Sequence, residues 1–311
     1  MEGIIKVGTT APVVNQSVSI DDAVESFLSE CDIRENSRNV YRRALLYFFK
    51  WVKDTGRTIN ELSRVDVICF KETLLATHSN LSVASYLVAL RRFYEWAEGN
   101  KLYPNIAKGI KSPKRKNAYL KEHLRENQIH SLLKYLAGNT RDYAIVNLLL
   151  RTGLRCIEIT RLNIEDVTYK GGKRILRVWG KGRDERDNFV VLTDKAYQPI
   201  KAYLETRGIT TLKEPLFIST SNRNLQGRLT TRTISKICKE SFRAIGIDGK
   251  EYTAHSLRHT TAVMLLKNGS LADVQSVLRH ASPATSQIYT KSIEEELRLE
   301  HPAEMKLDTA F

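Results

Sequence analysis

The sequence predicts a mainly α-helical protein with one small antiparallel β-sheet. Apolar residues recur at the three- and four-residue spacing of helices through most of the 311 residues. The segment 174–193 changes to short apolar runs typical of strands, ILRVW and NFVVL, joined by the glycine-containing connection GKGRDERD, and a shorter extended piece is expected over 215–218. The length suits two domains of ordinary size.

The first hundred residues predict a compact helical bundle. Ser19 and Ser63 are each followed three residues later by an aspartate, which is the pattern of a capped helix start. Two further helices are expected over 37–54 and 80–98, where aromatic and aliphatic residues recur on one face. We therefore expect a flexible N-terminal arm over residues 1–18 and a helical domain over residues 19–105.

The segment 106–123 is strongly basic. It contains Gly109 and Pro113, which disfavour a continuous helix, and Glu122 is its only acidic residue. We expect a linker that lies along a phosphate backbone, the alternative being a hinge without contacts. Basic residues here and on polar helix faces are the candidate DNA contacts: Arg38, Arg42, Arg43, Arg91, Arg92, Lys114, Arg115, Lys116, Arg232 and Lys236.

The overall composition favours a polyanionic partner. The net charge is +14 and the pI is about 9.6. The four cysteines lie far apart without a CxxC pair, which argues against a zinc site or disulfide framework and for a reducing compartment. No apolar run is long enough to span a bilayer, so a cytoplasmic protein without a membrane partner is expected.

In the second half, an apolar helix is followed directly by the motif TGLR. The dipeptide Thr152-Gly153 breaks the helix, and Arg155 begins another. Glu158 lies three residues after Arg155 and is therefore expected to hold the arginine side chain from the same helical face. Helices are also expected over 126–137, 142–150, 194–207, 231–244, 256–267, 271–278 and 283–290.

A third group of polar residues lies near the C-terminus. His255 and Arg258 are three residues apart, so they share one face of a helix. A guanidinium binds phosphate oxygens bidentately, and an imidazole beside it suits the chemistry of a phosphodiester. Tyr289 follows downstream and supplies a candidate nucleophile.

In chain order, these motifs resemble those of the tyrosine recombinases. TGLR, a GKG hairpin, HxxRH, LxH and IYT occur in the family's order, and the resemblance extends from about Ser19 to Tyr289. Arg279 departs from the pattern, because the family commonly has glycine before the LxH histidine, and it is expected to reach DNA or a neighbouring subunit. The matched catalytic positions are Arg155, Lys181, His255, Arg258, His280 and Tyr289.

The resemblance implies a role for each of these side chains. Tyr289 attacks the scissile phosphate, forming a 3′-phosphotyrosyl link and releasing a 5′-hydroxyl. Arg155 and Arg258 stabilise the charge on the phosphate, and Lys181 protonates the leaving oxygen. The family's scheme also has His255 assist proton transfer and His280 hydrogen-bond the phosphate. No metal or other cofactor is required.

The resemblance further implies a helical core-binding domain, a catalytic α+β domain over 124–291, and a C-shaped clamp around double-stranded DNA. The chain is expected to be a monomer or weak oligomer when free and a homotetramer on two DNA sites, where strands exchange through a Holliday junction. A tail over 292–311 is expected to dock on a neighbouring protomer. Integration or excision of a mobile element and Xer-like resolution both remain open as tasks. The alternative functions are a type IB topoisomerase and a non-catalytic DNA-binding protein.

Overall fold

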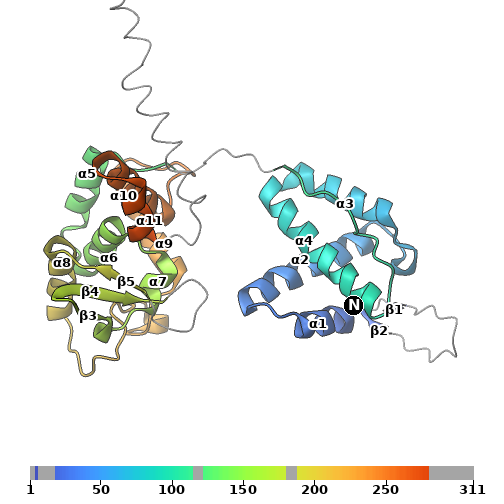
Figure 1. Cartoon of the computed structure of the whole chain (residues 1–311), viewed down its shortest axis with the longest axis horizontal. Helices are drawn as coiled ribbons and strands as arrows, with labels where there is room; N and C mark the ends of the chain where they lie inside the picture. The colour runs from blue at the N-terminus through green and yellow to red at the C-terminus, as the bar shows by residue number, and fades with distance from the viewer. Residues whose placement is uncertain (1–3, 6–17, 115–121, 180–187, 280–311) are drawn as a thin grey trace, which may run out of the picture. The chain divides into compact units, whose positions relative to one another are not determined.

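The computed structural model describes residues 4–5, 18–114, 122–179 and 188–279. The chain divides into two compact units, Met1–Asn117 and Ala118–Phe311 (Figure 1). The described residues are mainly helical and contain a small three-stranded antiparallel sheet, which confirms the predicted fold class. Among them, no helix combines the length and apolar character needed to cross a membrane.

The described residues of the first unit form a bundle of four α-helices. The Ser19 hydroxyl accepts the Asp22 N–H at 3.0 Å, and the Asp66 carboxylate accepts the Ser63 N–H at 2.8 Å, so both predicted caps are present. These bonds satisfy N–H groups that have no partner within their helices. The helices are α1 (Ile20–Glu30), α2 (Glu35–Asp54), α3 (Arg64–Thr77) and α4 (Asn80–Gly99).

Aromatic side chains fill the core of this bundle. Phe48 of α2 and Phe70 of α3 are fully buried and meet edge to face, with ring centroids 5.0 Å apart. Phe93 of α4 meets Phe27 of α1 in the same geometry at 5.6 Å. Phe49 of α2 also meets Phe93, with ring centroids 5.7 Å apart, so aromatic contacts join all four helices into a single core.

Two described segments near the ends of the first unit make specific contacts. β1 (Ile4–Ile5) pairs antiparallel with β2 (Val18–Ser19), so these parts of the expected N-terminal arm are paired rather than free. Arg91 donates to the Ile110 carbonyl at 3.0 Å and to the Ser112 hydroxyl at 3.1 Å. The first part of the basic segment thus lies against α4.

Helix α6 (Thr140–Thr152) is the centre of the second unit. Its residues 144–149 are all buried, and it packs against helices on several sides, which accounts for its nearly continuous apolar sequence. The surrounding helices are α5 (Glu126–Leu136), α7 (Cys156–Arg161), α8 (Asp194–Glu205), α9 (Thr231–Ala244), α10 (Ala254–Asn268) and α11 (Leu271–Leu278).

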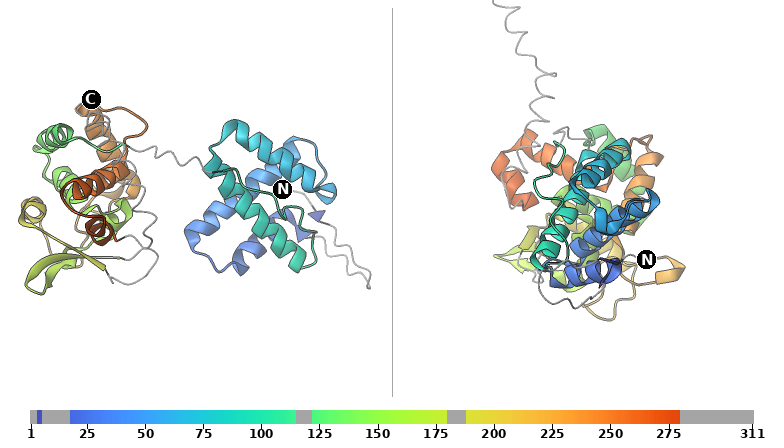
Figure 2. Two further views of the ribbon diagram at one scale, coloured as in Figure 1. Left: turned by 45° about the horizontal axis from the view of Figure 1, so that its top comes forward. Right: turned by 90° about the vertical axis from the view of Figure 1, so that its right-hand side faces the viewer.

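The antiparallel sheet lies along one side of the helices of the second unit (Figures 1 and 2). Its strand order is β3 (Val167–Lys170), β4 (Lys173–Val178) and β5 (Asn188–Val191). Strands β4 and β5 match the two predicted strands. Strand β3 was not predicted, and it joins β4 through Gly171-Gly172, both at positive φ as a tight hairpin turn requires.

Candidate active site

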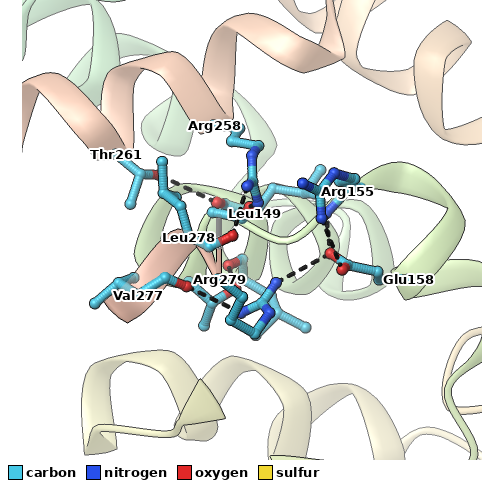
Figure 3. A network of polar contacts seen from close by, with 11 residues as sticks. Leu149, Arg155, Glu158, Arg258, Thr261, Val277, Leu278 and Arg279 are labelled. Atoms are coloured by element: carbon cyan, nitrogen blue, oxygen red, sulfur yellow. Dashed lines mark hydrogen bonds and ion pairs between the residues drawn. The ribbon is translucent and has the colours of Figure 1, made fainter. Parts of the chain in front are cut away.

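Arg258 lies at the centre of the candidate site. Its side chain projects from α10, and the residue is only 2% exposed. One guanidinium nitrogen, Nη2, donates to the Leu278 carbonyl at 2.6 Å, and Nη1 donates to the Gly153 carbonyl (Figure 3). Because the guanidinium is planar, two bonds of this kind fix its orientation between the end of α6 and the end of α11.

Gly153 makes this close approach possible. Its φ of +59° is in the left-handed region and ends α6. A Cβ atom at this position would lie 2.2 Å from Cδ2 of Leu278 and 3.4 Å from Cγ2 of Thr261. The glycine in TGLR is therefore required both by the backbone conformation and by the packing of α11.

Arg155 begins α7 and is held by Glu158. The Glu158 carboxylate accepts the Arg155 backbone N–H at 2.6 Å and its Nη1 at 3.2 Å. Glu158 is only 5% exposed, whereas the Arg155 side chain is 29% exposed. The carboxylate thus caps the helix start and orients an arginine that remains accessible to solvent.

Arg279 points toward Glu158 and Arg155. Its Nη2 lies 3.1 Å from Oε2 of Glu158, and its Nη1 donates to the Val277 carbonyl at 3.0 Å (Figure 3). The side chain is 11% exposed, and burial lowers the pKa of its guanidinium, an effect that nearby Glu158 opposes and Arg155 reinforces. The expectation that Arg279 reaches DNA or a neighbouring subunit is wrong for this conformation, because a buried carboxylate attracts it inward.

These contacts form a closed ring through three segments of the chain. Arg258 joins α10 to Gly153 and Leu278, and Arg279 follows Leu278 directly. Arg279 then contacts Glu158, which in turn contacts Arg155. The ring brings TGLR, HxxR and the turn before His280 together at one place. The sequence predicts that Glu158 holds Arg155, but it does not predict the contact between Glu158 and Arg279.

The two histidines of HxxRH occupy different environments. His255 is exposed on the first turn of α10, whereas His259 is buried with its ring centroid 5.6 Å from that of His123. Burial lowers the pKa of His259 to about 3, with further contributions from His123 and His255. His259 is therefore neutral near pH 7, and His255 is the histidine of this motif that faces solvent.

Two threonines attach α10 to neighbouring segments. The Thr261 hydroxyl donates to the Leu150 carbonyl at 2.7 Å, which connects α10 to α6. The Thr260 hydroxyl accepts the N–H of Leu124 at 2.9 Å, and Leu124 is fully buried. The chain that enters the second unit is thus tied to the helix that carries His255 and Arg258.

Replacing Thr260 by valine is expected to lower the free energy of unfolding by about 1–3 kcal/mol, because the buried Leu124 N–H loses its acceptor. Urea unfolding of the purified chain measures this change. Thr260→Ser keeps the hydroxyl and is expected to cost less. Equal stability of the valine variant and the wild type would show that this bond contributes nothing.

The candidate DNA contacts differ in how firmly the protein itself holds them. Arg42 makes a bidentate pair with Glu25 at 2.8 and 2.7 Å, and Arg38 donates to the Cys31 carbonyl at 3.2 Å. Arg91 holds the linker as described above. The remaining candidates within the described residues are exposed, although Lys236 also lies 3.7 Å from Glu240: Arg43, Arg92, Lys114, Arg232 and Lys236.

Part of the predicted site lies outside the described residues. Lys181, His280 and Tyr289 belong to this part, as do Arg115 and Lys116 and the helix expected over 283–290. Within the part of the chain that the structure describes, no group of three or more histidine, cysteine, aspartate or glutamate side chains is arranged to hold a metal ion.

Comparison with known families accounts for both units. Residues 122–296 match the family described as the phage integrase family, and residues 22–101 match its N-terminal SAM-like domain. The chain belongs to the phage integrase family. It is therefore a tyrosine-type site-specific recombinase, an enzyme that cleaves and rejoins DNA, and the type IB topoisomerase alternative is set aside.

Relatives of the recombinase include two Xer proteins. Tyrosine recombinase XerD of Listeria innocua is 32% identical over 284 residues, which is 87% of this chain and 93% of the relative. Tyrosine recombinase XerC of Caldanaerobacter subterraneus is 31% identical over 224 residues, or 69% of this chain and 60% of the relative.

Solved structures show the same fold at lower identity. The XerH recombinase bound to a palindromic difH substrate has a TM-score of 0.70 and 22% identity, covering 86% of this chain and 80% of that one. A lambda integrase dimer bound to a core site has a TM-score of 0.69 and 14% identity, covering 88% and 77%.

Proposed function

We propose that the recombinase cleaves DNA by attack of Tyr289 on the scissile phosphate. The attack forms a 3′-phosphotyrosyl bond, and the 5′ oxygen leaves with a proton as a hydroxyl. The observation that supports this proposal is the ring of contacts in which Arg258 joins Gly153 to Leu278. It brings two arginines to the residue that precedes His280, although these segments are far apart in the sequence.

The two arginines differ in what they contribute. Arg155 is the more accessible and is oriented by Glu158, so it binds the non-bridging oxygens of the phosphate. Arg258 is fixed by two carbonyls and supplies positive charge at the same place. Preorganised cations of this kind stabilise the charge of the transition state by several kcal/mol.

The remaining roles rest on the motif order in the sequence. Lys181 protonates the 5′ oxygen as it leaves, which an alkoxide requires because it is a poor leaving group. His255, exposed at the start of α10, assists proton transfer to or from Tyr289. His280 donates a hydrogen bond to the phosphate. No cofactor takes part in this scheme, because the bond energy is kept in the phosphotyrosyl link.

The proposed assembly is a homotetramer on two DNA sites, with a monomer or weak oligomer in the absence of DNA. Lambda integrase has been solved as a dimer on a core site and as a tetramer on a Holliday junction. The tail over 292–311 docks on a neighbouring protomer in this proposal. Because the relatives are bacterial, we place the reaction in the cytoplasm. The task is either Xer-like resolution or integration and excision of a mobile element.

A trapping experiment tests the proposed chemistry. Genomic fragments with a nick near each candidate site release the short strand after cleavage, so the covalent adduct accumulates. Sequencing the trapped DNA identifies the site, and mass spectrometry identifies the modified peptide. An adduct on Tyr289 supports the proposal, whereas an adduct on another residue or no adduct at all contradicts it. A single chromosomal site indicates resolution, and the two ends of a mobile element indicate integration or excision.

We also propose that both units, the helical domain over 19–105 and the catalytic domain over 124–291, contact DNA through their basic residues. The linker over 106–123 follows the phosphate backbone between them. Its first part is already held against α4, and the Asn80 side chain donates to the Lys114 carbonyl at 2.8 Å.

Replacing Lys114, Arg115 and Lys116 by glutamine is expected to reduce the slope of log binding constant against log salt by about 2–3, since each phosphate contact contributes about 0.9. Fluorescence anisotropy with the mapped site at several salt concentrations measures the slope. The matched control replaces three exposed lysines of the second unit, Lys173, Lys201 and Lys213. An unchanged slope in the linker variant would contradict the proposed contact.

A further inference from the structure

Arg279 occupies a position that favours glycine. Its φ of +52° lies in the left-handed region, where side chains other than glycine are strained. Glycine is common at this position in the family, so the backbone alone does not explain an arginine. The contacts of its guanidinium with Glu158 and Val277 offset that strain.

The arginine changes the charge of the cluster. Glu158 contributes one negative charge, while Arg155, Arg258 and Arg279 contribute one positive charge each, so the four charged side chains of the ring sum to +2. With glycine in place of Arg279, the remaining three side chains would sum to +1. The additional positive charge stabilises the negative charge that develops on the phosphate during cleavage, so its loss is expected to lower the cleavage rate rather than the affinity for the whole DNA site.

We propose that Arg279 is a positioning residue that neutralises Glu158 and thereby leaves Arg155 available to the scissile phosphate. The inference rests on the phosphate-binding role proposed for Arg155. Arg279 is assigned no contact with DNA of its own, because its side chain is nearly buried and both of its Nη atoms are bonded within the protein.

The geometry supports phosphate binding by Arg155 and neutralisation of Glu158 by Arg279. A carboxylate that is 5% exposed attracts a guanidinium more strongly than a carboxylate in water does. To bind a phosphate, Arg155 must weaken its 3.2 Å contact between Nη1 and Glu158 Oε1. The guanidinium of Arg279 on Oε2 of Glu158 weakens the electrostatic attraction between Glu158 and Arg155. The 2.6 Å bond from the Arg155 backbone N–H keeps the carboxylate in place meanwhile.

The test compares four variants in single-turnover cleavage of a nicked duplex that carries the mapped site. With Arg279→Gly, the cleavage rate at saturating DNA is expected to fall about tenfold while the dissociation constant for DNA stays unchanged. Arg279→Lys keeps the charge and is expected to restore most of the rate. With Glu158→Gln already present, adding Arg279→Gly is expected to change the rate by less than about twofold.

Other outcomes would overturn the inference. Equal losses from Arg279→Gly with and without Glu158→Gln would indicate a role independent of the carboxylate. Weaker DNA binding at an unchanged cleavage rate would indicate a direct DNA contact. If Arg279→Gly does not fold, as judged by thermal unfolding, Arg279→Asn replaces it, since asparagine also tolerates the left-handed region.

The failure of this inference is distinguishable from the failure of the proposed function. If the wild type forms no adduct on Tyr289, or Arg155→Ala cleaves as fast as the wild type, the proposed function itself is wrong. If the wild type forms the adduct, Arg155→Ala loses it and Arg279→Gly cleaves normally, only the positioning role of Arg279 is wrong.

Discussion

Replacement of Tyr289 by phenylalanine is expected to abolish the covalent adduct with nicked DNA and leave DNA binding intact. Phenylalanine keeps the aromatic ring and removes only the hydroxyl that attacks phosphorus. Loss of a nucleophile lowers an enzymatic rate by at least about 10³-fold. The adduct is measured as a band of lower mobility in a denaturing gel, and binding is measured by anisotropy with an intact duplex.

Tyr169→Phe is the matched control, because Tyr169 is an exposed tyrosine on strand β3 of the same unit. This control is expected to form the adduct at the wild-type rate. A Tyr289→Phe protein that forms the adduct at the wild-type level would refute the nucleophile assignment. Loss of DNA binding in the same variant would instead show that Tyr289 contributes to the interface.

Replacement of Gly153 by alanine is expected to lower the free energy of unfolding by about 3 kcal/mol. The left-handed φ of +59° strains any other residue, and the new Cβ would lie 2.2 Å from Cδ2 of the fully buried Leu278. Leu278 must then move, and its carbonyl is a partner of Arg258. Cleavage is therefore expected to fall together with stability.

Gly246→Ala separates the strain of the left-handed backbone from the clash of the new Cβ with Leu278. Gly246 has a φ of +81° in the same unit, and no heavy atom lies within 4 Å of its added Cβ. This variant is expected to lose only the conformational contribution, about 1 kcal/mol, and to cleave normally. Urea unfolding and single-turnover cleavage measure both effects. Equal losses in the two variants would show that the contact between Gly153 and Leu278 is relaxed at little cost.

Most helices of the protein could be predicted from the sequence, because the information is local. The caps at Ser19 and Ser63 and the span of α11 appear in the structure as the spacing of polar and apolar residues predicts. Strand β3 was missed because a four-residue strand without a long alternating pattern resembles a loop until it pairs with β4.

The order of the motifs determined the family by itself, and the contacts between them were decided only by the tertiary structure. Arg258 bonds to a carbonyl 105 residues away, and Arg279 contacts a carboxylate 121 residues away. Spacing along the chain describes only neighbours three or four residues apart. The inward direction of Arg279 and the burial of His259 behind the exposed His255 depend on how α6, α10 and α11 pack. The nearly buried charge of Arg279 requires an oppositely charged partner, and the fold places Glu158 beside it.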